Sequence, residues 1–231
     1  MRSVMWHASN LMNAISVQCR GDRNYRFSPE TTALLVIDLQ KEFFTDDIGE
    51  CFEEMQSILP RVATIIALAR KLGCKVIHTR ESYKPDLSDV HAYRRSLNYV
   101  GEPGPLGRFN IVGEPGHEFA DQVKPLPAEP VIDKASFGAF YNTTLDDLLR
   151  QDDIDHLIIC GVTTQCCVHS TLREAVDRGY WCLTIADCCA ASDPGMHDAA
   201  LKIISGEGHL FGWVSDAQNI QNGASSNTDT T

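Results

Sequence analysis

Residues 156–176 read HLIICGVTTQCCVHSTLREAV, and this stretch decides the fold. It begins with a continuous apolar run over residues 156–160, which is the pattern of a strand covered on both faces. After Gly161 the apolar residues recur at the spacing of one helix face, and Gly179 is placed to end that helix. The residues with this spacing are Val168, Leu172, Ala175 and Val176. The stretch therefore predicts a buried strand that leads through a turn into an amphipathic helix.

The same alternation of apolar runs and helical patterns extends over most of the chain. Further runs that predict buried strands lie at residues 32–37, 75–78, 130–132 and 181–185, with a weaker one at 210–214. Helical spacing lies between them, at residues 58–69 before Gly73 and at residues 145–149. Strands that alternate with helices predict a doubly wound, mostly parallel six-stranded sheet with helices on both faces, a Rossmann-type α/β arrangement of three layers.

The alternating pattern divides the chain into three parts. Residues 1–30 form an N-terminal extension, and residues 31–217 form the α/β domain. Residues 218–231 are rich in Asn, Ser and Thr, so we expect a disordered tail. Within the domain, residues 82–128 are rich in Pro, Gly and Arg and show little periodicity. A loop of that length in a compact domain is usually functional.

The composition excludes several classes of protein. Of the 231 residues, 43% are hydrophobic and 22% are charged, and the formal charge of −11 argues against nucleic acid or an anionic membrane as a partner. The nine cysteines include no Cys-x-x-Cys pair, and a disulfide framework is unusual in a chain with a core this large. The first 20 residues lack the apolar core of a signal peptide, and no apolar stretch reaches the roughly 20 residues of a membrane span. We therefore expect a soluble, cytoplasmic protein.

Three polar residues follow predicted strands at the point where each strand ends. Asp38 comes directly after residues 32–37, Lys134 follows the third strand, and Cys167 lies in the turn after residues 156–160. Ligands bind at the carboxyl ends of the strands in such sheets. A cysteine at the start of a helix is favoured as a thiolate, a nearby lysine favours it further, and a carboxylate can move its proton. These residues therefore predict a nucleophilic hydrolase site.

These motifs resemble those of the isochorismatase-like cysteine hydrolases. The resemblance includes a strand-ending D-x-Q at residues 38–40, the lysine at 134 before a loop of small and aromatic residues, and G-V-x-T-x-x-C-V at residues 161–168. It implies that Cys167 is the nucleophile, while Cys166 is its variable neighbour. It also implies a cis peptide bond before Thr163, and an oxyanion hole formed by the backbone amides of Thr163 and Cys167.

Within that family, the long loop resembles the biuret hydrolases and their ureide-cleaving relatives. The similar segments are residues 79–81, 85–87, 104–105, 107–108, 113–116, 173–175, 177–180 and 187–189. The resemblance implies substrate contacts for Phe43, Phe137 and Glu207. Biuret hydrolases carry a lysine where this chain has Phe137 and a glutamine where it has Glu207, so the substrate could differ from biuret.

We expect neither a metal nor an organic cofactor. Nicotinamidases of this family hold zinc through an Asp-x-His and a later His, but residues 79–85 contain no histidine. No Gly-x-Gly-x-x-Gly follows a strand, so no nucleotide site is indicated. Arg80, Arg94 and Arg95 are interpreted as solvated or ion-paired rather than substrate-binding.

The sequence leads to one principal hypothesis and two alternatives. The principal one is a metal-free cysteine amidohydrolase that cleaves a terminal amide C–N bond of a small linear ureide, such as biuret or triuret, and releases ammonia through a thioester. The first alternative is an N-carbamoyl amidase or ureidoacrylate-type hydrolase with the same catalytic residues, Asp38, Lys134 and Cys167. The second is a non-catalytic binding protein of this fold. The family resemblance also implies a homo-oligomer, with a tetramer expected.

Overall fold

The structure, a computed structural model that describes residues 14–45 and 52–228, is built around a six-stranded sheet. The strands are β3 (Thr32–Ile37), β4 (Lys75–Glu81), β7 (Val131–Lys134), β8 (His156–Val162), β9 (Trp181–Ala190) and β10 (Trp213–Ser215). Their order is β10-β9-β8-β3-β4-β7 and every neighbouring pair is parallel. Each predicted apolar run corresponds to one of these strands. The structure thus confirms the doubly wound parallel sheet.

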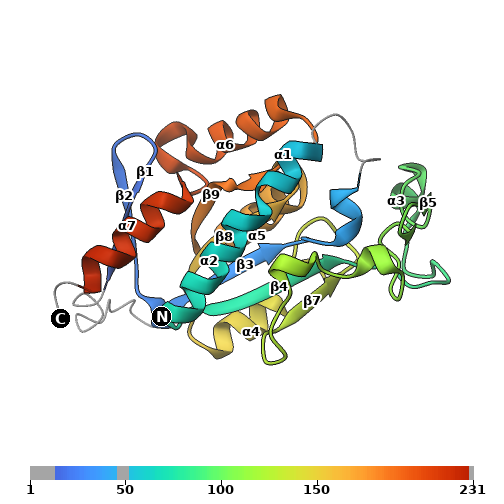
Figure 1. Ribbon diagram of the computed structural model, residues 1–231, viewed down its shortest axis with the longest axis horizontal. Helices are drawn as coiled ribbons and strands as arrows, with labels where there is room; N and C mark the ends of the chain where they lie inside the picture. Colours follow the sequence, from blue (N-terminus) through green and yellow to red (C-terminus); the bar gives the residue numbers. More distant parts are fainter. Residues whose placement is uncertain (1–13, 46–51, 229–231) are drawn as a thin grey trace.

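Helices cover the sheet on both faces (Figure 1). On one face, α1 (Phe52–Ser57) and α2 (Leu59–Leu72) connect β3 to β4. On the other, α4 (Leu145–Gln151) leads into β8, α5 (His169–Asp177) joins β8 to β9, and α6 (Pro194–His209) joins β9 to β10. All six residues of β3 are buried because this strand lies inside the sheet under both helix layers. Gly73 ends α2 in the left-handed conformation, at φ 83°, as predicted for a C-cap.

The N-terminal extension and the C-terminal segment pack against each other. The hairpin of β1 (Ile15–Cys19) and β2 (Arg23–Phe27) leads through η2 (Pro29–Thr31) into β3. The final helix α7 (Ala217–Thr228) contacts β1 and buries Ile220 and Ala224. The expectation of a disordered tail is therefore wrong for residues 218–228, because two residues four apart bury one face of a helix. Residues 229–231 lie outside the described residues.

The long loop is organised by short elements that its sequence pattern does not reveal. It contains α3 (Ala92–Ser96), β5 (Pro103–Gly104), β6 (Gly107–Arg108), η4 (Pro115–His117) and η5 (Asp121–Val123). Tyr83, just after β4, pairs with Ile111 as an isolated bridge. The amide of Asn110 donates a hydrogen bond to Glu42 Oε2 at 3.0 Å, and Glu42 lies in η3 (Lys41–Phe44) after β3. The loop is thereby fixed to the carboxyl ends of two central strands.

One glycine sets how closely the central strands approach at that edge. Gly161 of β8 is opposite Ile37 of β3 and has φ +122°, a conformation that side chains disfavour. A Cβ at residue 161 would overlap the backbone carbonyl oxygen of Ile37. The carboxyl ends of β3 and β8 therefore lie in direct backbone contact, one residue before Asp38.

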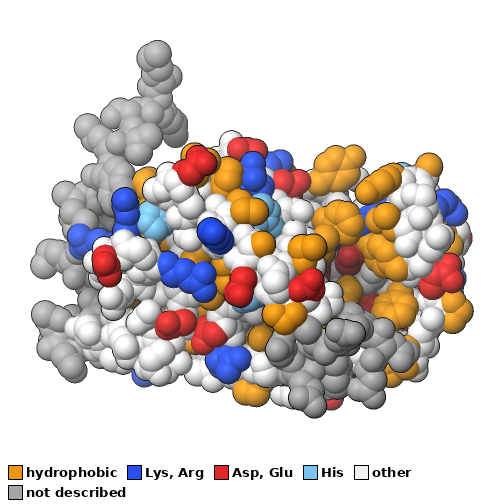
Figure 2. Space-filling model, turned by 90° about the horizontal axis from the view of Figure 1, so that it is seen from above, with side chains coloured by type: hydrophobic (Ala, Val, Ile, Leu, Met, Phe, Trp, Pro, Cys, Tyr) orange, Lys and Arg blue, Asp and Glu red, His pale blue; other side chains and the backbone are white. Residues whose placement is uncertain are grey.

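The surface differs between the two ends of the molecule. Figure 2 shows hydrophobic side chains gathered toward the end that carries the long loop, with acidic side chains between them. Tyr93, Leu97 and Val112 of that loop are exposed. Within residues 14–45 and 52–228, no helix has the length and apolar character needed to cross a membrane.

Candidate active site

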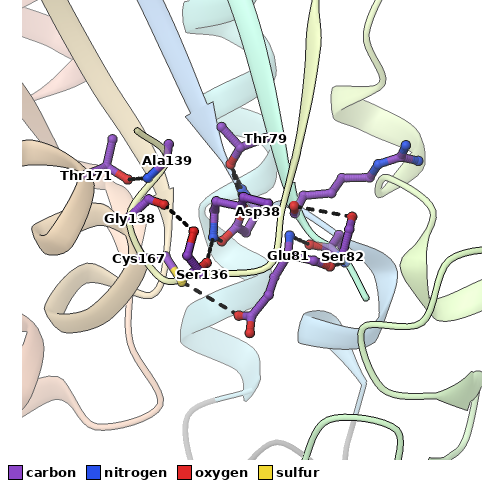
Figure 3. A network of polar contacts seen from close by, with 12 residues as sticks. Asp38, Thr79, Glu81, Ser82, Ser136, Gly138, Ala139, Cys167 and Thr171 are labelled. Carbon is purple, nitrogen blue, oxygen red and sulfur yellow. Dashed lines mark hydrogen bonds and ion pairs between the residues drawn. The ribbon is translucent and has the colours of Figure 1, made fainter. Parts of the chain in front are cut away.

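Asp38, Glu81 and Cys167 meet at the carboxyl edge of the central strands (Figure 3), and Lys134 pairs with Asp38 there. Asp38 directly follows β3, Glu81 ends β4, Lys134 ends β7, and Cys167 lies in η6 (Thr164–Val168) after β8. Donor atoms of Asp38, Glu81 and Cys167 all lie within 4.8 Å of one another. The structure thus brings together the three residues predicted from the strand ends and adds Glu81, which that prediction missed.

Asp38 and Lys134 form a fully buried ion pair. The Lys134 Nζ lies 2.7 Å from Asp38 Oδ2, and both side chains have no exposed area. The Thr79 hydroxyl donates a hydrogen bond to Asp38 Oδ1 at 2.5 Å, so both carboxylate oxygens have a partner. Burial lowers the pKa of Lys134, but the negative charge of Asp38, with Cys167 and Glu81, raises it by more, and the net pKa lies above the ordinary value. Lys134 is therefore a fixed positive charge at neutral pH.

Cys167 is a buried thiol in a short π-helical turn that continues into α5. The peptide bond between Val162 and Thr163 is cis, as the family resemblance implies. The neighbouring Cys166 thiol and burial raise the pKa of Cys167, and Lys134 opposes the rise. This direction is opposite to the thiolate expected from the helix start and the nearby lysine, because burial and Cys166 outweigh Lys134. A nearby base is therefore needed to accept the thiol proton before the sulfur attacks.

The loop after Lys134 is tied to the helix that follows Cys167. Lys134 Nζ donates to the carbonyl oxygen of Ser136 at 2.8 Å. The amide of Ala139 donates to Thr171 Oγ1 at 3.1 Å, and Thr171 lies on α5 (Figure 3). Glu174, also on α5, accepts from the amide of Phe140 at 3.0 Å. These bonds fix the position of the ammonium relative to the nucleophile.

Glu81 is held from both its backbone and its side chain. Gln40 Oε1 accepts from the Glu81 amide at 2.7 Å, and Gln40 Nε2 donates to the Glu81 carbonyl oxygen at 3.1 Å. The Tyr99 and Tyr83 hydroxyls donate to Glu81 Oε1 at 2.8 and 3.2 Å. Burial raises the pKa of Glu81, and the charges of Lys134 and Arg94 oppose that effect. The Glu81 carboxyl thus has a fixed position beside the nucleophile, with Oε2 3.9 Å from the Cys167 Sγ.

Arg94 of α3 provides the countercharge for Glu81. Its Nη2 lies 3.0 Å from Glu81 Oε1, its Nη1 donates to the Tyr99 hydroxyl at 2.6 Å, and its side chain is only 2% exposed. The guanidinium carbon lies 3.3 Å from the centre of the Phe137 ring, a cation–π contact. The interpretation of Arg94 as ion-paired agrees with this geometry. Its burial against Phe137 at the active site is a feature that the sequence analysis missed.

The other predicted substrate contacts differ in where they lie. Phe137 reaches the cluster through Arg94. Phe43 is half-buried in η3 against the main core, and its substrate contact stays a prediction. The structure does not bring Glu207 to the cluster, because α6 runs from the end of β9 back to the start of β10 and leaves Glu207 exposed near the opposite edge. The oxyanion role of the Thr163 and Cys167 amides also stays a prediction.

The same cluster offers donor atoms for a metal ion. A carboxylate oxygen from each of Asp38 and Glu81, with the Cys167 sulfur, is a set that can hold a divalent cation. Lys134 and Arg94, however, already pair with the two carboxylates. The positive charge that a metal would supply thus comes from side chains.

We therefore expect dialysis against EDTA to leave kcat unchanged. Initial rates of product release, measured before and after dialysis and after addition of Zn²⁺, test this expectation. A loss of activity that Zn²⁺ restores would instead identify the carboxylate–thiolate cluster as a metal site.

Comparison with known proteins gives consistent matches over the α/β domain. The family model described as the isochorismatase domain matches residues 32–219. The ureidoacrylate amidohydrolase RutB of Cronobacter turicensis is 28% identical over 223 residues, covering 90% of this chain and 94% of that protein. The crystal structure of a cysteine hydrolase from Pseudomonas syringae pv. phaseolicola has a TM-score of 0.77 at 26% identity and covers 87% of this chain and 95% of that chain. An isochorismatase family protein from Desulfovibrio vulgaris has a TM-score of 0.73 at 28% identity, with 83% and 97% coverage.

Proposed function

The chain belongs to the isochorismatase family and is a cysteine hydrolase acting on amide C–N bonds, and from this premise we propose that its substrate is a small ureido compound. The observation that carries the proposal is the buried Asp38–Lys134 ion pair beside the Cys167 thiol. This arrangement supplies a nucleophile, a group that moves its proton and a fixed positive charge.

The first half of the reaction forms a thioester. Asp38 accepts the Cys167 proton, and the thiolate attacks the ureido carbonyl carbon to form a C–S bond. The amides of Thr163 and Cys167 hold the oxyanion, and Lys134 balances the negative charge that accumulates. Asp38 then returns the proton to the departing nitrogen, the C–N bond breaks and ammonia leaves. Proton transfer by a positioned group of this kind contributes about 10²–10⁴-fold to the rate.

The second half of the reaction regenerates the thiol. With ammonia gone, water reaches the thioester carbonyl, and Asp38 accepts a proton from that water as it attacks. The C–S bond breaks, the acid product leaves, and Cys167 recovers a proton from Asp38. Throughout both halves Lys134 keeps its charge, because its pKa lies above its ordinary value.

The charge of the cluster favours an uncharged substrate. Two carboxylates, Asp38 and Glu81, are paired with two cations, Lys134 and Arg94. A substrate carboxylate would add a negative charge to this buried group without a further cation from it, and an uncompensated buried charge is costly. A neutral linear ureide of the biuret or triuret type is therefore the first candidate.

A carboxylated ureide is the second candidate. It is favoured by the similarity to ureidoacrylate amidohydrolases, which extends over 90% of this chain in Cronobacter turicensis and 87% in Methylorubrum extorquens. The carboxylate of such a substrate would need to lie away from Glu81. The same Asp38, Lys134 and Cys167 would carry out the reaction.

Ammonia release from a panel of compounds tests the proposal. The panel contains biuret, triuret, ureidoacrylate, N-carbamoyl amino acids and nicotinamide, with the Cys167→Ser variant as the matched control. We expect fast release from biuret or triuret by the natural chain and almost none by the variant. Release only from the carboxylated compounds would select the second candidate. Hydrolysis of nicotinamide alone, or of no member of the panel, would contradict a ureido substrate.

A further inference from the structure

The two oxygens of Glu81 have different surroundings. Oε1 accepts hydrogen bonds from the Tyr99 hydroxyl at 2.8 Å and the Tyr83 hydroxyl at 3.2 Å, and it forms an ion pair with Arg94 Nη2 at 3.0 Å. Oε2 accepts a hydrogen bond from the Cys167 thiol, with the oxygen 3.9 Å from the sulfur. Because Oε1 is fixed by these partners, Oε2 is directed at any group that is bound to the Cys167 sulfur.

We propose that Glu81 is a specificity-determining residue whose Oε2 accepts a hydrogen bond from the N–H that stays attached to the substrate carbonyl. This inference rests on the proposed ureido substrate. A ureide carries nitrogen on both sides of its carbonyl group: one nitrogen leaves, with its proton supplied by Asp38, and the other stays on the thioester. Oxygen atoms of Glu81 and Asp38 and the Cys167 sulfur lie within 4.8 Å of one another, so Glu81 Oε2 is within reach of a nitrogen that stays on the carbonyl carbon bound to the sulfur.

The alternative chemical role for Glu81 is to take the thiol proton itself. The Cys167 thiol donates to Glu81 Oε2, whereas the two Asp38 oxygens are engaged by Thr79 and Lys134, although a carboxylate oxygen accepts more than one hydrogen bond. Glu81, in contrast, is coupled to a residue of the long loop, Arg94, and through it to Phe137. A group set by loop residues is suited to selecting the substrate, while a group set by the sheet is suited to the chemistry common to a family.

The environment of Oε1 makes one substitution especially informative. Tyr99 and Tyr83 donate to this position and the Arg94 cation pairs with it, so in Glu81→Gln the amide oxygen is held there. The Gln amide nitrogen must then occupy the position of Oε2. The atom that faces the substrate changes from an acceptor to a donor, with almost no change in shape, and it opposes the N–H of a ureide.

The test compares a ureide with its carbon analogue. Biuret and malonamide differ only at the central group, which is N–H in biuret and CH₂ in malonamide, and both lose ammonia from a terminal amide. We expect the natural chain to prefer biuret, and Glu81→Gln to lower kcat/KM for biuret by about 10–100-fold more than for malonamide, as for a lost hydrogen bond to a charged group. If the natural chain cleaves a different ureide, that compound and its CH₂ analogue form the pair.

Equal losses for both members of the pair would overturn the inference, because they would mean that Glu81 moves the thiol proton or only supports the fold. Glu81→Gln also leaves Arg94 without its countercharge, so Glu81→Gln/Arg94→Met is the second variant, in which both charges are removed. Thermal unfolding and the rate of Cys167 alkylation by iodoacetamide show whether each variant retains its site. If the natural chain cleaves no ureide, the proposed function itself is contradicted. If the natural chain cleaves the ureide and both variants keep its preference for the ureide over the CH₂ analogue, only the role of Glu81 is contradicted.

Discussion

Replacing Cys167 with serine is expected to reduce kcat by about 10³-fold or more while substrate binding persists. The serine hydroxyl has nearly the size of the thiol, but it is a much weaker acid. Asp38 pairs with Lys134 and not with a histidine that could activate a serine. Steady-state rates give the loss of turnover, and calorimetric titration of the variant with the ureide that the natural chain cleaves gives the binding constant.

The adjacent cysteine is the matched control for this prediction. Cys166 is half-buried and directly precedes Cys167 in the chain. If Cys167 is the nucleophile, Cys166→Ser should retain turnover. Acid quench of the natural chain during turnover, followed by peptide mass spectrometry, should place the acyl adduct on Cys167. Turnover that survives in Cys167→Ser and disappears in Cys166→Ser would reverse the assignment.

Replacing Lys134 with methionine is expected to abolish detectable turnover and to lower the free energy of unfolding by about 3–5 kcal/mol. The substitution leaves Asp38 as an unpaired charge with no exposed surface. It also removes the cation that balances the oxyanion. Urea unfolding followed by circular dichroism measures the stability, and the biuret or ureide assay measures the activity. A variant as stable as the natural chain would contradict the expected cost of leaving the buried carboxylate at residue 38 without its partner.

A double variant separates the two effects of Lys134. In Asp38→Asn/Lys134→Met no buried charge is left at this position, so most of the stability should return while activity stays absent.

The stability difference between Lys134→Met and the natural chain has a defined pH window. Because the folded pKa of Lys134 is raised, its contribution is complete below the unfolded lysine value of about 10.4 and is lost only as the pH rises through the higher folded value. The difference between Lys134→Met and the natural chain should therefore be constant from neutral pH to pH 9.

The sequence was sufficient to predict the sheet and three residues of the site because both depend on local patterns. Continuous apolar runs mark strands buried on both faces, and the residue after such a run lies at the carboxyl edge. Asp38 and Lys134 follow that rule directly. Cys167 needed the additional pattern of a turn leading into a helix. The six-stranded order, however, depends on which strands pair, and the sequence pattern gave only the architecture.

Glu81 was missed because the strand was assumed to end with the apolar residue pattern at His78. In the structure β4 continues to Glu81. The preceding residue, Arg80, forms an ion pair with Asp133. The same strand-end rule would have selected Glu81 if the strand had been extended by three residues. Arg94 could not be found in this way, since its burial depends on a partner from another segment.

The C-terminal helix illustrates a different limit. Its buried residues include Ala217, Ile220 and Ala224, and two of these three are alanines. Alanine contributes little to an apolar pattern, so polar neighbours dominate the segment's composition. The helix is stabilised by the hairpin of β1 and β2, which lies at the other end of the chain. Composition alone therefore indicates disorder where tertiary contact provides order.

Gly161 separates what can be varied in this scaffold from what cannot. Its contact with Ile37 fixes the seam between β3 and β8, so randomisation at that position would mostly yield unfolded chains. Arg94, Tyr99 and Phe137 lie outside the seam: Arg94 and Tyr99 contact Glu81, and Phe137 packs on Arg94. A directed-evolution library intended to retarget the enzyme should therefore sample these loop positions, with the seam left as the invariant frame in which new selectivities are built.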